Sequence, residues 1–323
     1  MLLPGIINKG IFDYIKRRPA LSILKIDGVT KTYANHTALD NVSFEIPAGC
    51  IFGLLGPNGA GKTSLIRIIT QITGADSGHI YFKGERLKPA HTKNIGYLPE
   101  ERGLYKKMKV GEQLLYLTQL KGLSKADATA RIKTWVDRFE IREWLGKHIE
   151  DLSKGMQQKV QFIATVLHEP ALIILDEPFS GFDPINANLI KDEILRLRDN
   201  GATIIFSTHR MESVEELCDN IALINRAQKV LDGPVKEVKD AYKTDTYQVI
   251  GNGQLLILSP DFQVLEQHDN HGIFRAHIRL LNGATPNDLL RYLIQRVEVH
   301  SFVELVPSIN DIFIQKVTET HHV

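Results

Sequence analysis

The stretch LLGPNGAGKTSL, residues 54–65, leaves this chain few possible folds. Lys62 and Thr63 directly follow a loop with three glycines, which allow sharp turns and close approach to a ligand: Gly56, Gly59 and Gly61. The spacing matches the phosphate-loop pattern G-x-x-x-x-G-K-[ST], in which backbone N–H groups before a helix surround an anion. The pattern therefore predicts a strand, a phosphate-binding loop and a helix, in that order.

An acidic strand end follows downstream, in the segment ALIILDEP. Its short apolar run predicts a buried strand that ends at Asp176 and Glu177. We expect Lys62 to reach the β- and γ-phosphates, and Thr63 and Asp176 to bind Mg²⁺. Glu177 is placed to orient, or accept a proton from, a water that attacks the γ-phosphate. A solvated turn would also contain two acids, but it would not accompany a phosphate loop.

Composition and sequence patterns argue against several other classes of protein. Hydrophobic residues make up 43% of the 323 residues, and the net charge of +1 gives no sign of nucleic-acid binding. Cys50 and Cys218 lie far apart in sequence, which is typical of a reduced, cytoplasmic protein. No apolar run reaches the length of a membrane span. Residues near the N-terminus with four-residue spacing fit a short amphipathic helix, either on a membrane surface or packed as an extension: Leu3, Ile7, Ile11 and Ile15.

Strand-like and helical segments alternate from about Leu24 to Gly233. The alternation predicts an α/β architecture with a mostly parallel central sheet. Residues from about 106 to 155 contain no good strand, so we expect an inserted helical subdomain there. After Gly233 a small α+β domain is expected, with strands near 247–250, 255–258, 263–267, 274–280 and 297–306 and helices near 287–295 and 310–316. The expected division is an N-terminal extension over 1–21, a nucleotide-binding domain over 22–240 and an accessory domain over 241–323.

The segment DLSKGMQQKV, residues 151–160, lies between the phosphate loop and the acidic strand end. It matches the signature L-S-G-G-Q at three positions: Leu152, Ser153 and Gly155. Lys154 replaces the first glycine and Met156 the glutamine. In this order the motifs resemble those of the ATP-binding-cassette (ABC) ATPases. The resemblance implies a P-loop NTPase core with an antiparallel β subdomain and an inserted helical subdomain.

The resemblance also implies roles for single residues. Tyr33 would stack on adenine, although a half-buried strand tyrosine is the alternative. Glu100 stands where the family commonly has glutamine, and would face the attacking water or Mg²⁺. Asp183, in SGFDP, would contact the opposite subunit and also cap the helix that begins at Pro184. His209 would sense the γ-phosphate.

The expected site residues fall into three groups. Catalytic residues are Lys62, Glu177 and His209. Mg²⁺ ligands are Thr63, Asp176 and Glu100. The nucleotide-binding set is Tyr33, Gly56, Pro57, Asn58, Gly59, Ala60, Gly61, Lys62, Thr63, Ser64, Glu100, Ser153, Gly155 and Asp183. The remaining histidines with no comparable context are expected to be surface or satisfied residues: His36, His79, His91, His148 and His168.

The partners also follow from the resemblance. Two cassettes would face head to tail, as an ATP-dependent homodimer or heterodimer, with each ATP between one phosphate loop and the other signature. The terminal segment ELVPSINDIFIQKV resembles the accessory domain of ABC-2-type exporters. A separate multi-spanning ABC-2-type membrane permease, reached from the cytoplasmic face of the cell membrane, is therefore expected, with export as the direction and no nucleic-acid partner.

Two soluble alternatives have different sequence requirements. A chromosome-associated ABC protein needs a long coiled-coil insertion, and residues 64–151 contain no heptad run. A ribosome-acting tandem ATPase needs two phosphate loops, and the sequence contains one. The sequence therefore favours the ATPase subunit of a transporter.

Overall fold

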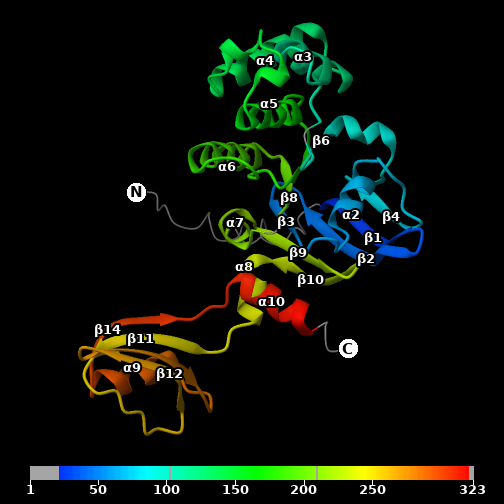
Figure 1. The fold of residues 1–323 in the computed structure, drawn as a ribbon. Helices are drawn as coiled ribbons and strands as arrows, with labels where there is room; N and C mark the ends of the chain where they lie inside the picture. Colours follow the sequence, from blue (N-terminus) through cyan, green and yellow to red (C-terminus); the bar gives the residue numbers. More distant parts are fainter. Residues whose placement is uncertain (1–21, 102, 209, 320–323) are drawn as a thin grey trace, which may run out of the picture. The chain divides into compact units, whose positions relative to one another are not determined.

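The computed structural model describes residues 22–101, 103–208 and 210–319 (Figure 1). The extension expected over 1–21, with its helix, and His209 lie outside these residues. The chain divides into two compact units, and the division falls between Pro234 and Val235. Among the helices in the described ranges, none combines the length and apolar character that crossing a membrane requires.

A six-stranded sheet in the order β10-β9-β3-β8-β7-β6 forms the centre of the first unit (Figure 1). All of its strands run parallel except the edge strand β10, so the predicted, mostly parallel sheet is confirmed. The strands β3, β7 and β8 are buried along their whole length, as expected for a parallel sheet covered on both faces. The strand bounds are β3 Ile51–Leu55, β6 Ile95–Leu98, β7 Leu172–Asp176, β8 Thr203–Ser207, β9 Asn220–Asn225 and β10 Gln228–Pro234.

A second, antiparallel sheet in the order β2-β1-β4-β5 packs against the first, which confirms the expected antiparallel subdomain. Phe44 of β2 and Phe52 of β3 stack with ring centroids 5.5 Å apart, and both belong to one continuous hydrophobic core. The phosphate loop leads from β3 into helix α2. The bounds are β1 Ser22–Tyr33, β2 His36–Pro47, α2 Lys62–Ile69, β4 Ser77–Phe82, β5 Glu85–Arg86 and the 3₁₀ helix η1 Pro89–Asn94.

The expected helical subdomain contains three α-helices, α3 Val110–Leu120, α4 Lys125–Arg138 and α5 Lys154–Val166, with the 3₁₀ turns η2 Arg142–Trp144 and η3 Ile149–Asp151. The rings of Trp135, Phe139 and Phe162 pack together between α4 and α5. Two further helices, α6 Pro184–Asp199 and α7 Met211–Leu217, follow β7 and β8. These crossover helices connect the parallel strands, which an antiparallel hairpin could not do.

The second unit contains an antiparallel sheet in the order β12-β13-β11-β14, with α9 packed on one face through Leu289 and Leu293. Its elements are α8 Val235–Ala241, β11 Thr246–Asn252, β12 Phe262–Asn270, β13 Ile273–Leu280, α9 Pro286–Ile294, β14 Glu298–Glu304 and α10 Ile309–Glu319. Because α8 contacts α10, the structural division precedes the expected boundary at 240/241 by one short helix.

The strand expected over 255–258 is wrong. The apolar run LLIL forms an irregular connection between β11 and β12. Leu255 is buried, but Leu258 is 88% exposed, and its N–H donates to the hydroxyl of Tyr292 in α9 at 3.0 Å. The run therefore contacts helix α9 through this hydrogen bond and does not pair with the sheet, although its composition alone is typical of a strand.

Candidate functional site

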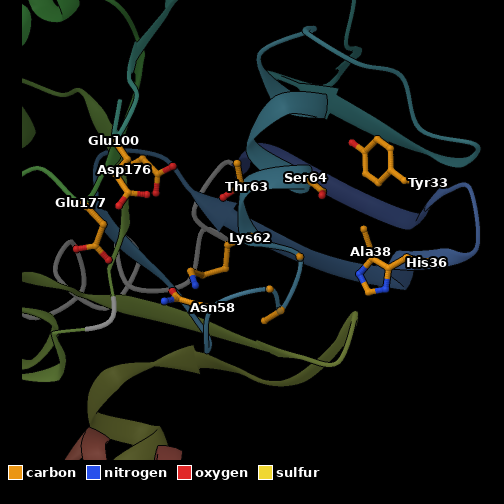
Figure 2. Close-up of a pocket in the computed structure, with 13 residues that line it drawn as sticks. Tyr33, His36, Ala38, Asn58, Lys62, Thr63, Ser64, Glu100, Asp176 and Glu177 are labelled. Carbon is orange, nitrogen blue, oxygen red and sulfur yellow. The ribbon is translucent and has the colours of Figure 1, made fainter. Parts of the chain in front are cut away.

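A cleft opens beside the carboxyl ends of the parallel strands, where the loops after β3, β6 and β7 meet (Figure 2). Figure 2 shows the acidic side chains at one end, Tyr33 and His36 at the other, and Lys62 and Thr63 between them. The arrangement places a cation and a hydroxyl in the middle of the cleft. The lining residues are Tyr33, His36, Ala38, Asn58, Gly59, Ala60, Gly61, Lys62, Thr63, Ser64, Glu100, Asp176 and Glu177.

Two glycines of the phosphate loop occupy positions where no other residue fits. Gly56 has φ of 149°, and a Cβ atom there would lie 2.1 Å from the carbonyl oxygen of Ile224. Gly61 has φ of 116°, and its Cβ would lie 2.2 Å from the carbonyl oxygen of Ala38. The loop backbone thus packs directly on β9 and β2, which fixes its position at the edge of the sheet.

Helix α2 begins directly after this loop. Gly61 precedes its first residue, and no side chain of the described residues caps its first turn. The unpaired N–H groups and the helix dipole favour an anion at this end. Lys62 Nζ lies beside the same loop, where it donates to the carbonyl oxygens of Gly56 at 2.7 Å and Pro57 at 3.1 Å. The ammonium is therefore held where a phosphate bound at the helix end would meet it.

The acidic end of the cleft combines three carboxylates from two loops. Asp176 ends β7 and is 6% exposed. Burial raises the pKa of Asp176, the charges of Glu100 and Glu177 raise it further, and Lys62 opposes them. Burial lowers the pKa of Lys62, whereas the three carboxylates raise it. Burial is thus the main cause of both pKa shifts, and the opposite charge across the cleft acts against each of them.

The end of β8 holds Glu177 in place. The backbone of Glu177 is left-handed, with φ of 49°, and its N–H donates to the carbonyl oxygen of Ser207 at 2.9 Å. The hydroxyl of Thr208 donates to Glu177 Oε2 at 3.1 Å. A non-glycine residue at positive φ is uncommon and costs conformational energy, so the hydrogen bonds to β8 support this carboxylate in an otherwise unfavourable conformation.

The donor atoms around Thr63 suit a hard cation. The hydroxyl of Thr63 and the carboxylates of Asp176 and Glu100 line the same cleft, and Mg²⁺ prefers such oxygen ligands. Within the described ranges, no three His, Cys, Asp or Glu side chains are grouped so as to hold a metal by themselves. Mg²⁺ is commonly bound by one or two carboxylates together with substrate phosphates. The residues present therefore fit a cation that shares the oxygens of a bound nucleotide.

The opposite end of the cleft is built by the β1–β2 hairpin. Tyr33 is 40% exposed, and Lys31 Nζ lies 5.3 Å from the centroid of its ring. Asp76 holds Lys31 through a 2.6 Å hydrogen bond. His36 pairs with Tyr33 across the hairpin and is exposed, as expected of a surface residue, and it also lines the cleft. The two-residue spacing between Tyr33 and His36 is the sequence signal for this pairing.

Five of the expected site residues within the described ranges do not line this cleft: Gly56, Pro57, Ser153, Gly155 and Asp183. The hydroxyl of Ser153 caps α5 and accepts from the N–H of Met156 at 3.3 Å. Asp183 accepts from the N–H of Asn186 at 3.0 Å, which confirms the predicted cap before Pro184. The signature therefore lies at the start of a different helix from the phosphate loop.

His168 corrects the expectation that these histidines are surface or satisfied residues. It is buried, and neither of its ring nitrogens has a hydrogen-bond partner among the described residues. Burial lowers its pKa to about 4, and the charges of Lys121 and Arg131 contribute. His168 does not line the cleft.

Comparisons with known proteins identify the family of this chain. Residues 39–180 match the family described as ABC transporter, and residues 233–317 match the C-terminal domain described as ATP-binding protein DrrA1-3-like. The chain is 41% identical over 295 residues to the uncharacterized ABC transporter ATP-binding protein YhaQ of Bacillus subtilis, a match that covers 91% of this chain and 98% of that protein. It is also 32% identical over 235 residues to Nod factor export ATP-binding protein I of Cupriavidus metallidurans, which covers 72% and 78%.

A solved structure of an ATP-binding subunit of an ABC transporter superposes with a TM-score of 0.65 at 28% identity, over 68% of this chain and 93% of that one. The matches favour a transporter subunit over the chromosome-associated and ribosome-acting alternatives. The predicted fold class and the predicted ATPase are confirmed, and the chain belongs to the ATP-binding proteins of ABC transporters.

Proposed function

We propose that this chain hydrolyses Mg·ATP in an ATP-dependent dimer of two cassettes and thereby drives export through a separate ABC-2-type permease. The observation that carries the proposal is the composition of the cleft. Lys62, Thr63 and three carboxylates share it, whereas Ser153 and Gly155 do not line it. A signature outside its own cleft is available to complete the site of a second chain, and the cleft supplies a cation, a hydroxyl and carboxylates of the kind that phosphoryl transfer uses.

The expected site residues have separate roles in this proposal. The N–H groups of the loop from Gly56 to Ser64, except at Pro57, which has none, and the ammonium of Lys62 bind the phosphates, and Tyr33 stacks on adenine. Thr63, Asp176 and Glu100 hold Mg²⁺, which would offset phosphate charge when bound. Glu177 accepts the proton of the attacking water, and His209 contacts the γ-phosphate.

The partners and the direction rest on the comparisons. Subunits of this family work with membrane permeases in transporter complexes. The similarity to Nod factor export ATP-binding protein I supports outward transport. We place the chain on the cytoplasmic face of the cell membrane, bound through the permease, with residues 22–240 as the nucleotide-binding domain and 241–323 as the accessory domain. The second cassette is either an identical chain or a different one.

The substitution Glu177→Gln tests the mechanism. It keeps the size and hydrogen bonding of the side chain but removes proton acceptance, so the ATPase kcat should fall about 10²- to 10⁴-fold. ATP should then persist between two chains, and the protein should run as a dimer with Mg·ATP and shift toward monomer with ADP. Light scattering on a sizing column measures both states.

Two further variants complete this test. Ser153→Arg in the Glu177→Gln protein should abolish the ATP dimer. The bulky, charged side chain would fill the space in which the phosphates bound by the second chain must lie. Glu143→Gln, on an exposed residue, is the matched control and should hydrolyse ATP at the parental rate. A Glu177→Gln protein with parental turnover would contradict the assigned role, and a signature variant that still dimerises would contradict the proposed dimer.

A further inference from the structure

Helix α5 carries a row of polar side chains on one face. Gln158, Gln161 and Thr165 are three and four residues apart, so they project from the same side of the helix. Gln161 and Thr165 are each 6% exposed. Buried polar side chains need hydrogen-bond partners, and the partners of this row lie next to the catalytic carboxylates. The same helix begins at the Ser153 cap of the signature.

Gln158 holds the loop that follows Glu177. Its Nε2 donates to the carbonyl oxygen of Ser180. Ser180 in turn closes a turn with Glu177, since its N–H donates to the Glu177 carbonyl oxygen at 3.0 Å. The next residue, Gly181, is left-handed, and a Cβ there would lie 3.5 Å from the Gln158 amide nitrogen. The side chain of Gln158 therefore packs directly on the backbone of the turn that begins at Glu177.

Gln161 holds the loop that carries Glu100. Its Nε2 lies 3.4 Å from the carbonyl oxygens of both Pro99 and Glu101, the two neighbours of Glu100. The hydroxyl of Thr165 donates to the Gln161 carbonyl oxygen at 2.9 Å, one turn along the helix.

Helix α5 and strand β6, which leads to Glu100, are in close backbone contact. A Cβ on Gly96 of β6 would lie 2.5 Å from the carbonyl oxygen of Thr165. The hydroxyl of Thr165 also reaches the carbonyl oxygen of Tyr97 at 3.4 Å. Helix α5 and the Glu100 loop are thus joined by side chains and by direct backbone contact.

The two glutamines and the two carboxylates also line one small pocket. It is lined by Gln158, Gln161, Glu100 and Glu177, with Asp176 and apolar residues completing the wall. We infer that Gln158 and Gln161 are positioning residues for ATP hydrolysis: they fix Glu177 and Glu100 relative to each other and to the helix that begins at the signature. The inference rests on the proposed function, because it takes Glu177 and Glu100 as the groups that act on the attacking water.

Fold stability does not account for Gln158. Its amide oxygen is buried and has no hydrogen-bond partner among the described residues. A buried unpaired acceptor is destabilising, whereas an apolar side chain of similar length has no polar atom that needs a hydrogen bond. Methionine has such a shape and adapts to irregular space. Gln158→Met loses the hydrogen bond to Ser180 but also removes the unpaired acceptor, so the thermal unfolding midpoint should change little while the Glu177 loop is disturbed.

The experiment uses the full chain and measures kcat and KM for ATP. Gln158→Met and Gln161→Met should each lower kcat about 10- to 100-fold, because small displacements of catalytic groups have effects of this size. The KM should change less than about twofold, since ground-state binding through Tyr33 and the phosphate loop is unaltered. Gln119→Met, on an exposed position of α3, is the matched control and should leave both constants unchanged.

Double variants separate positioning from a structural role. If Gln158 acts through Glu177, Gln158→Met should cause no further loss in a Glu177→Gln protein. Gln161→Met should likewise cause no further loss of kcat in a Glu100→Gln protein. If Gln158→Met does not fold, this second pair of variants tests the inference. Losses that multiply in both pairs, or single variants with parental kcat, would overturn the inference. Parental kcat in Glu177→Gln would instead refute the proposed function.

Discussion

A comparison of two alanine substitutions in the phosphate loop tests whether the loop is fixed by its glycines. Gly61→Ala puts a Cβ atom 2.2 Å from the carbonyl oxygen of Ala38, more than an ångström short of ordinary contact, which begins at 3.4 Å. A left-handed backbone costs a residue with a Cβ about 1–2 kcal/mol. Because Ala38 lies in a paired strand and cannot yield easily, the total loss in unfolding free energy should exceed about 3 kcal/mol.

Gly59→Ala is the matched control within the same loop. Gly59 also has a positive φ, of 79°, but, apart from the glycine and its two chain neighbours, no described residue has an atom within 4 Å of the position that a Cβ atom would take there. It should therefore lose only the backbone contribution of about 1–2 kcal/mol. Urea unfolding without nucleotide measures both variants. Equal stabilities for the two alanine variants would refute the argument that contact with β2 fixes the loop.

Two more predictions concern the second unit and the buried histidine. A chain truncated after Pro234 should remain folded and bind ATP with parental affinity in calorimetry, because the cleft lies entirely before that residue; a folded fragment without ATP affinity would contradict this. His168 has a pKa of about 4 in the fold and a reference value of 6.5, so the unfolded chain takes up the proton first as pH falls. Above pH 6.5 the free energy of unfolding should not depend on the titration of His168. Between pH 6.5 and about pH 4 it should fall by up to about 3 kcal/mol, at 1.36 kcal/mol per pKa unit. Urea unfolding at several pH values should show this loss in the parent and not in His168→Leu.

The sequence was sufficient for the parts of the site that follow one another along the chain. The phosphate loop and the acidic strand end have fixed spacings, and parallel strands bring their carboxyl ends to one edge, so Lys62 and Asp176 were predictable neighbours. His36 was not, because its place in the cleft depends on the hairpin pairing with Tyr33. The run over 255–258 was wrongly predicted to be a strand, because composition cannot show that its backbone bonds to the Tyr292 hydroxyl instead of to a neighbouring strand.

The α5 contacts were beyond sequence reasoning for a different reason. Gln158 and Gln161 lie close to the signature in sequence, but their partners Ser180 and Pro99 come from loops on either side. Helical periodicity shows that the two glutamines share a face, and only the packing of α5 on β6 shows what that face meets. Sequence spacing therefore predicts which residues a single element presents, and tertiary packing decides which loops they hold.

The charge balance of the cleft gives a last prediction, about binding without metal. Three carboxylates face one ammonium there, so metal-free ATP, itself an anion, meets repulsion from Asp176 that Mg²⁺ would offset. For charges about 8–10 Å apart at an effective dielectric constant of about 20, one carboxylate contributes about 2 kcal/mol. Asp176→Asn should therefore bind ATP in EDTA about tenfold or more tightly than the parent, and lose most of the gain in affinity that Mg²⁺ gives the parent. Calorimetry with and without Mg²⁺ measures both effects. If Asp176→Asn binds metal-free ATP no better than the parent and still gains fully from Mg²⁺, Asp176 neither faces the phosphates nor holds the ion.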